Sequence, residues 1–158
     1  MIYRHPQLVN GELYHISDRA VGDTVIFDSE NDFYRGIFSI YEFNTSKPVI
    51  IRERRRIRDQ FKSKENYRRR TSVILSDEWV DERDRLVDIL AFSFMPNHLH
   101  LILKQLKDNG ITEFMRKVNG GYAKYFNEKY GRRGHLFNKF RAVHIKDDDQ
   151  LKNAFTYV

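Results

Sequence analysis

The spacing of apolar and polar residues along the chain predicts four β-strands. Side chains of a strand point alternately to its two faces, and the stretch around Ile16 alternates in this way, with Tyr14 and His15 on opposite faces. A later stretch is almost continuously apolar, which predicts a strand buried on both faces. Pro96-Asn97 is typical of a tight turn, so the strand that follows should form a hairpin with it. The strands are expected at residues 8–20, 85–95, 98–105 and 135–146.

Apolar residues repeated every three or four positions predict three helices. They are expected at 28–43, from Thr112 to a break at 131–134, and from an aspartate cap at 147–149 to Val158. The apolar stripes are Phe33, Ile37, Ile40 and Tyr41 in the first helix, and Phe114, Val118, Tyr122, Tyr125 and Phe126 in the second. Gly120 and Gly121 each cost the second helix about 1 kcal/mol relative to alanine. Such a pair predicts the close approach of another backbone or of a ligand.

The order of these elements predicts the fold. Leaving out residues 49–84, it reads β-α-β-β-α-β followed by a helix, which is the ferredoxin-like arrangement of the α+β class, with an antiparallel sheet and helices on one face. A length of 158 residues fits a single domain, 1–158. The chain has no cysteine, no apolar segment of about 18 residues that could span a membrane, and no apolar core at residues 1–10 that could act as a signal peptide. A cytoplasmic protein is expected.

Residues 49–84 form a charged insertion, expected to contain one or two short helices. Between positions 52 and 70 there are ten cations and three acids, so this window carries +7 while the whole chain carries +6. Concentrated positive charge suits a polyanion, because Lys and Arg neutralise phosphates. The candidate contacts are Arg54, Arg55, Arg56, Arg68, Arg69 and Arg70. A solvated charged helix without a partner is the alternative.

His98 and His100 are the most informative residues of the chain. In a strand they share one face, about 7 Å apart, while Leu99 lies on the other. Neutral imidazole is a common metal ligand. The spacing alone leaves open whether the pair binds a metal or is only packed.

The motifs around this pair resemble the HUH single-strand DNA transposases, most closely the REP-associated tyrosine transposases. The resemblance lies in four stretches in the same order as in that family: YHISDR at 14–19, FMPNHLHLI at 94–102, YAKYFN with GRRGHLF at 122–137, and DQL to YV at 149–158. Only the charged insertion lies outside it.

The resemblance implies metal-dependent cleavage of single-stranded DNA at hairpins. His98 and His100 would hold Mg²⁺ or Mn²⁺, and Tyr157 would attack the scissile phosphodiester to give a 5′-phosphotyrosine. Nucleic-acid contacts are expected from Arg19, Arg132, Arg133, Lys139 and Arg141. A further ligand of the family, an Asn or Gln one turn beyond the nucleophile, would follow Val158.

Several alternatives stay open at this point. Tyr122 or Tyr125 could be the nucleophile, although both also fit a packed helix face. The chain could bind hairpins without cutting them, or it could be a phosphodiesterase whose histidines activate water. A homodimer and a monomer are both compatible with the sequence.

Overall fold

The computed structural model describes residues 7–53, 56, 59–60, 62–63, 81 and 83–158. Its elements are β1 (Leu13–Arg19), α1 (Glu30–Glu42), β2 (Val87–Met95), β3 (His98–Gln105), α3 (Gly110–Tyr130), β4 (Arg141–Ile145) and α4 (Asp148–Tyr157). This order is the predicted β-α-β-β-α-β core followed by a last helix.

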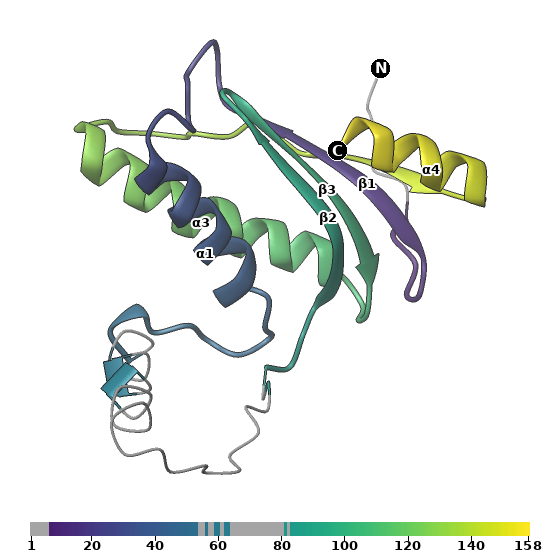
Figure 1. The fold of residues 1–158 in the computed structure, drawn as a ribbon, viewed down its shortest axis with the longest axis horizontal. Coiled ribbons are helices and arrows are strands. Elements are labelled where there is room, and N and C mark those ends of the chain that lie inside the picture. Colours follow the sequence, from purple (N-terminus) through teal and green to yellow (C-terminus); the bar gives the residue numbers. More distant parts are fainter. Residues whose placement is uncertain (1–6, 54–55, 57–58, 61, 64–80, 82) are drawn as a thin grey trace.

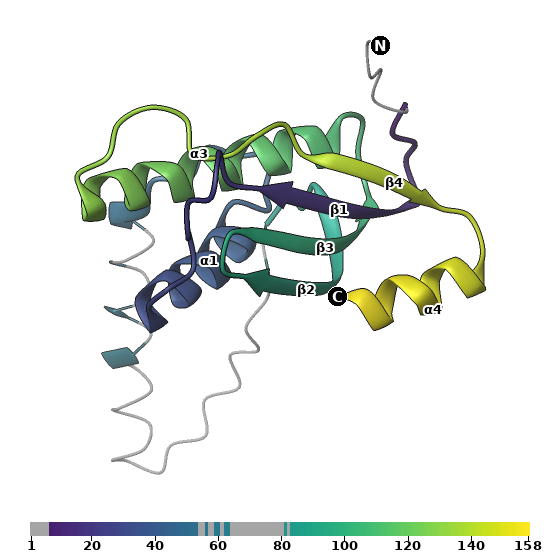
Figure 2. The same cartoon turned by 90° about the horizontal axis from the view of Figure 1, so that it is seen from above.

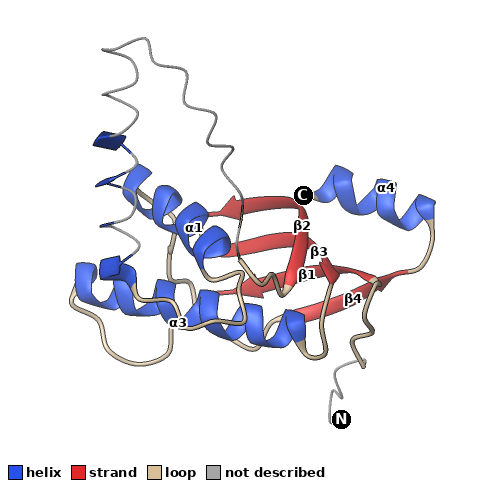
Figure 3. Ribbon diagram, turned by 90° about the horizontal axis from the view of Figure 1, so that it is seen from below, coloured by secondary structure: helices blue, strands red, loops and turns tan. Residues whose placement is uncertain are grey.

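The four strands form one sheet in the order β2-β3-β1-β4, and every neighbouring pair is antiparallel. Helices α1 and α3 cover one face of the sheet, whereas α4 lies against the other (Figures 1 and 3). The predicted α+β class and antiparallel sheet are therefore confirmed. Helix α4 runs back from the end of β4 toward β2 (Figure 2), and Val143, which pairs with His15 on this face of the sheet, is 61% exposed.

The main core lies between the sheet and the helices α1 and α3. Alternate residues of the two central strands face it, including Ile16 of β1 and Leu101 of β3, neither of which is exposed. Phe114 and Tyr122 of α3 pack in the same cluster, as their helical spacing predicted. A second, smaller cluster of Ile102, Ile145 and Ala154 joins α4 to the opposite face.

The prediction that β2 is buried on both faces is wrong. This strand lies at the edge of the sheet, and Leu90, Phe92 and Met95 are 40%, 43% and 43% exposed. A bulge between Ile89 and Ala91 interrupts its register with β3. A continuous apolar run does not distinguish a central strand from an edge strand, because only the pairing partners decide that.

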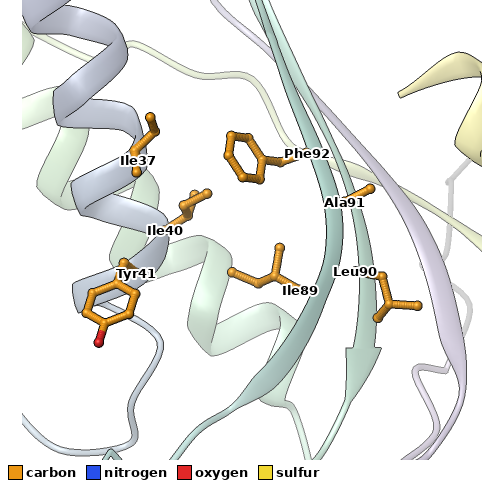
Figure 4. A pocket seen from close by; sticks show the side chains of 7 residues that line it. All are labelled: Ile37, Ile40, Tyr41, Ile89, Leu90, Ala91 and Phe92. Atoms are coloured by element: carbon orange, nitrogen blue, oxygen red, sulfur yellow. The ribbon is translucent and has the colours of Figure 1, made fainter. Parts of the chain in front are cut away.

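Phe92 and Ile89 instead point toward α1 across an apolar pocket of about 420 Å³ (Figure 4). On the helix side, Ile37 and Tyr41 line it and are 44% and 40% exposed. The predicted apolar stripe of α1 is thus only partly buried, with Ile40 as its buried member.

The start of α3 differs from the prediction. The helix begins at Gly110 with Asn109 in the left-handed conformation, two residues before Thr112. The backbone N–H of Ile111 donates to Gln105 Oε1, so a side chain from β3 replaces the expected threonine cap. A Cβ at position 110 would lie 2.5 Å from the carbonyl oxygen of Leu86, which explains the glycine.

The two central glycines of α3 behave differently. A Cβ on Gly121 would lie 2.2 Å from the ring of Phe43, whereas one on Gly120 would meet nothing within 4 Å. The prediction of a neighbouring backbone or ligand is therefore wrong at both positions: an aromatic side chain makes the close approach at Gly121, and nothing approaches Gly120.

The last strand is shorter than expected. Only Arg141–Ile145 pair with β1, and Phe137 makes an isolated bridge to Ala20. Asn138 binds the carbonyl oxygens of Arg19 and Ala20 through its backbone and side-chain nitrogens, and this holds the preceding segment beside β1 without a regular ladder. The final helix begins as predicted, because the Asp147 side chain accepts a hydrogen bond from the Gln150 N–H at 2.8 Å.

Within the charged insertion, Arg56 is helical and exposed. Arg54, Arg55, Arg68, Arg69 and Arg70 lie outside the described residues. Among the helices that the structure describes, none combines the length and the apolar character that crossing a bilayer requires.

Candidate active site

Three histidines meet on the sheet face that carries α4. His98 and His100 come from β3 and His15 from β1, and all three occupy positions facing away from the main core. The ring centroids of His98 and His100 are 5.0 Å apart, and those of His15 and His100 are 5.1 Å apart in a stacked pair. The alternation of the two strands brings this cluster together.

Each histidine of the β3 pair has one ring nitrogen bound by a neighbour. His98 Nδ1 lies 2.7 Å from Asn97 Oδ1, and His100 Nδ1 lies 3.0 Å from His15 Nε2. The Nε2 atoms of both have no hydrogen-bond partner within the described part of the chain. Two imidazole nitrogens thus fit a divalent metal, although no group of three or more His, Cys, Asp or Glu side chains that could hold one occurs among the described residues.

The surroundings keep these rings neutral. Burial, aided by the charges of His15, His98 and Arg19, lowers the pKa of His100 to about 4. Burial also lowers the pKa of His15, and burial together with the charge of Arg19 lowers that of His98. Because a metal binds the unprotonated ring, the rings are in the metal-binding form at pH 7.

Helix α4 brings Tyr157 to this cluster. Its ring centroid lies 5.8 Å from that of His100 in an edge-on contact and 6.3 Å from that of His15. The tyrosine is 75% exposed, and its hydroxyl has no hydrogen-bond partner among the described residues. The phenol is therefore open to a substrate that enters from solvent.

The other two candidate tyrosines lie on the opposite side of the sheet. Tyr122 is buried in the main core, where its hydroxyl donates to the Ile26 carbonyl and burial raises its pKa far above the usual range. The Tyr125 hydroxyl donates to Asp32 at 3.0 Å. The sheet separates both from the histidines, so neither can share a phosphate with them.

The predicted nucleic-acid contacts divide into two groups. Arg19 pairs with His98 and Arg141 with Ser17, so both come from positions on the histidine face. Arg132 lies at the end of α3, with its guanidinium 5.8 Å from the centre of the Phe126 ring. Arg133 and Lys139 are exposed in the connection between α3 and β4.

His15 is the site residue that the sequence reasoning missed. Alternation in β1 already placed it on the face opposite Ile16, but its position beside His100 depends on the pairing of β1 with β3. That pairing joins residues far apart in the chain, and no local signal gives its register.

A comparison with protein families decides the relationship. The sequence model described as "Transposase IS200 like" matches residues 58–158. The chain belongs to the IS200-like transposase family. The match begins inside the charged segment and includes the histidine pair and Tyr157, whereas β1 and α1 lie before it.

Solved structures extend the comparison. The chain is similar to a REP-associated tyrosine transposase whose structure was solved bound to a REP hairpin, with a TM-score of 0.55 and 12% sequence identity. The similarity covers 97% of this chain and 67% of that one, and it shows a common fold. None of the curated proteins matches the sequence.

Proposed function

We propose that this protein cleaves and rejoins single-stranded DNA at hairpins through a covalent tyrosine intermediate. The observation that carries the proposal is the position of Tyr157, exposed and edge-on to His100 on the open sheet face. Membership of the IS200-like family and the hairpin bound to the structural neighbour support the same substrate class.

His98 and His100 would hold a divalent metal, Mg²⁺ or Mn²⁺, through their Nε2 atoms. Both rings are neutral at pH 7 and have their Nδ1 atoms engaged elsewhere, which suits this role. The ion would polarise a phosphate oxygen and offset the charge that develops there. A third ligand, at a position after Val158, stays a prediction.

In the proposed step Tyr157 Oη attacks the phosphorus of the scissile phosphodiester. The phenol loses its proton to solvent, a bond forms between Oη and phosphorus, and the bond from phosphorus to the 3′-oxygen breaks. The leaving oxygen takes a proton from water and becomes a free 3′-hydroxyl. In the rejoining step the same 3′-hydroxyl, or another one, loses its proton to solvent and attacks the phosphorus of the phosphotyrosine. The bond from phosphorus to Tyr157 Oη breaks, the phenol takes up a proton, and a phosphodiester is restored.

Positive charge beside the histidines would hold the strand. Arg19 and Arg141 come from positions on the same face, and phosphate contacts of this kind fix the position of a strand without reading its sequence. Arg132, Arg133, Lys139 and the arginines of the charged insertion would contact DNA farther from the cleavage point. A monomer and a homodimer are both compatible with this arrangement.

The test uses single-stranded DNA that carries a hairpin and a label on the 5′-phosphate side of the cut. With Mg²⁺ or Mn²⁺ the wild-type protein should give a covalent protein–DNA band on a denaturing gel, and EDTA should remove it. Tyr157→Phe should give no adduct but bind the DNA with unchanged affinity. Tyr34→Phe, a change at a tyrosine that is 68% exposed on α1, serves as the matched control and should behave as wild type.

Each of the other outcomes would support a different function or mechanism. An adduct that persists in Tyr157→Phe refutes the assignment of Tyr157 as the nucleophile. A native complex without any cleavage identifies a hairpin-binding protein that does not cut. Product that forms without an adduct, and is unaffected by Tyr157→Phe, identifies a phosphodiesterase in which the histidines activate water.

A further inference from the structure

His15 has no role in the mechanism described so far, yet it makes the only side-chain hydrogen bond of His100 among the described residues. The two rings stack with an interplanar angle of 27°, and Nε2 of His15 lies 3.0 Å from Nδ1 of His100. The Tyr157 ring also lies beside the His15 ring, and their centroids are 6.3 Å apart. His15 therefore contacts both groups to which the proposed reaction is assigned.

The two histidines of β3 are held in the same manner. Asn97 Oδ1 can only accept a hydrogen bond, so His98 must carry its proton on Nδ1, which leaves an unprotonated Nε2. For His100 to present Nε2 in the same form, its Nδ1–H also needs an acceptor. The nitrogen of His15 is the one acceptor within reach in the described part of the chain.

We propose that His15 is a positioning residue of this site: its Nε2 accepts a hydrogen bond from His100 Nδ1–H and so keeps His100 Nε2 free to bind a divalent metal. The inference rests on the proposed function for the metal, but the hydrogen bond itself does not need the metal to be present. His15 is not a ligand in this arrangement, because its Nε2 is already occupied by His100.

The pairing of β1 with β3 makes this arrangement rigid. His15 and His100 stand on neighbouring strands in a continuous antiparallel register, and His15 is half-buried against α4. A partner on a packed strand fixes both the tautomer and the ring orientation of the ligand that it contacts.

The first measurement reads the tautomer of His100 in the metal-free protein, by long-range ¹H–¹⁵N NMR spectra at pH 7.5. In the wild-type protein His100 should carry its proton on Nδ1. His15→Leu removes the acceptor and should give a mixture of the two tautomers, whereas His15→Gln offers a carbonyl oxygen and should restore the Nδ1–H form. His144→Leu is the matched control: this β4 histidine binds Glu12, and its loss should leave His100 unchanged.

The second measurement is the affinity for Mn²⁺ alone, followed by electron paramagnetic resonance. His15→Leu should bind Mn²⁺ about 10- to 100-fold more weakly than the wild type, the range typical for the loss of a residue that orients a ligand. His15→Gln should recover most of this loss. A His15→Leu variant with wild-type Mn²⁺ affinity and an unchanged His100 tautomer would overturn the inference, as would equal losses in His15→Leu and His15→Gln.

The two proposals fail in different ways. A wild-type protein that binds no Mn²⁺, or forms no adduct, refutes the proposed chemistry, while the NMR result still decides whether His15 fixes His100. An adduct in the wild type with no tautomer change in His15→Leu refutes the role of His15 alone.

Discussion

Asp18 is a carboxylate without exposed surface on the core side of β1, and its replacement by asparagine gives a sharp test of the structure. Asn119 Nδ2 donates to one of its oxygens at 2.7 Å. The other oxygen, Asp18 Oδ1, and the buried Asn119 Oδ1 have no hydrogen-bond partner among the described residues. Burial raises the pKa of Asp18 to about 7, against the lowering effect of the hydrogen bonds from Asn119 and from the Arg19 backbone.

The sign of the pH effect follows from these values. Between its ordinary pKa of 3.8 and about 7, Asp18 is protonated in the folded state and ionised in the unfolded state. Stability therefore falls as pH rises through this window. Each pH unit between the two pKa values lowers the free energy of unfolding by about 1.4 kcal/mol. Above pH 7 the total cost of ionising the buried Asp18 is therefore at most about 4 kcal/mol.

Asp18→Asn should remove this cost, because an amide stays neutral and adds the donor that the carboxylate lacks. Urea unfolding at pH 5, 6, 7 and 8 measures the difference in the free energy of unfolding between variant and wild type. We expect the free energy of unfolding of Asp18→Asn, relative to that of the wild type, to increase by about 2–3 kcal/mol from pH 5 to pH 8. The lowered pKa values of the site histidines make stability rise with pH. Because this contribution is the same in both proteins, it cancels in the difference and only the effect of Asp18 remains.

Asp23→Asn is the matched control, since Asp23 is exposed in the loop after β1. Its difference from wild type should stay within about 0.5 kcal/mol at every pH. A difference for Asp18→Asn that is constant from pH 5 to pH 8 would mean that Asp18 is ionised throughout this range, and would contradict a raised pKa for the buried carboxyl.

Two further predictions concern α3 and α4. Gly121→Ala forces a methyl group into the Phe43 ring and should lower the free energy of unfolding by about 1–3 kcal/mol, whereas Gly120→Ala, which meets nothing, should raise it by up to about 1 kcal/mol. Urea unfolding measures both, and equal effects would contradict the packing. Asp147→Ala removes the cap that binds the Gln150 N–H and should destabilise α4 by about 1 kcal/mol. Amide hydrogen exchange should then speed up in α4 but not in α3, and exchange that is unchanged in α4 would contradict the role of the cap.

Local signals predicted the central part of the fold well. The Pro96-Asn97 turn and the regular alternation after it gave β3 with the bounds that the structure has, and the aspartates near 147 gave the start of α4. The errors arose where distant contacts decide. The edge position of β2 depends on which strands pair, and α3 starts early because Gln105 reaches over to cap it.

The candidate site was predictable in part for the same reason. His98 and His100 are neighbours in one strand, so their common face follows from alternation alone. The meeting of Tyr157 with His100 requires α4 to dock on the open face through the small cluster around Ala154, and a helical pattern does not reveal this. The position of His15 beside His100 depends on the register of β1 against β3, which no local pattern in the sequence predicts.

The alternation of β3 also links the accuracy of folding to the chemistry of the site. A shift of this strand by one residue against β1 would turn His98 and His100 into the core and expose Leu99 and Leu101. Each buried leucine lost to solvent costs about 1.5–3 kcal/mol, and the buried imidazoles would lose their hydrogen bonds. The packing of the core therefore disfavours a sheet in the wrong register, in which the histidines would not form the site. A substitution at His98 or His100 leaves the leucine part of this penalty in place, because Leu99 and Leu101 lie on the opposite face of the strand.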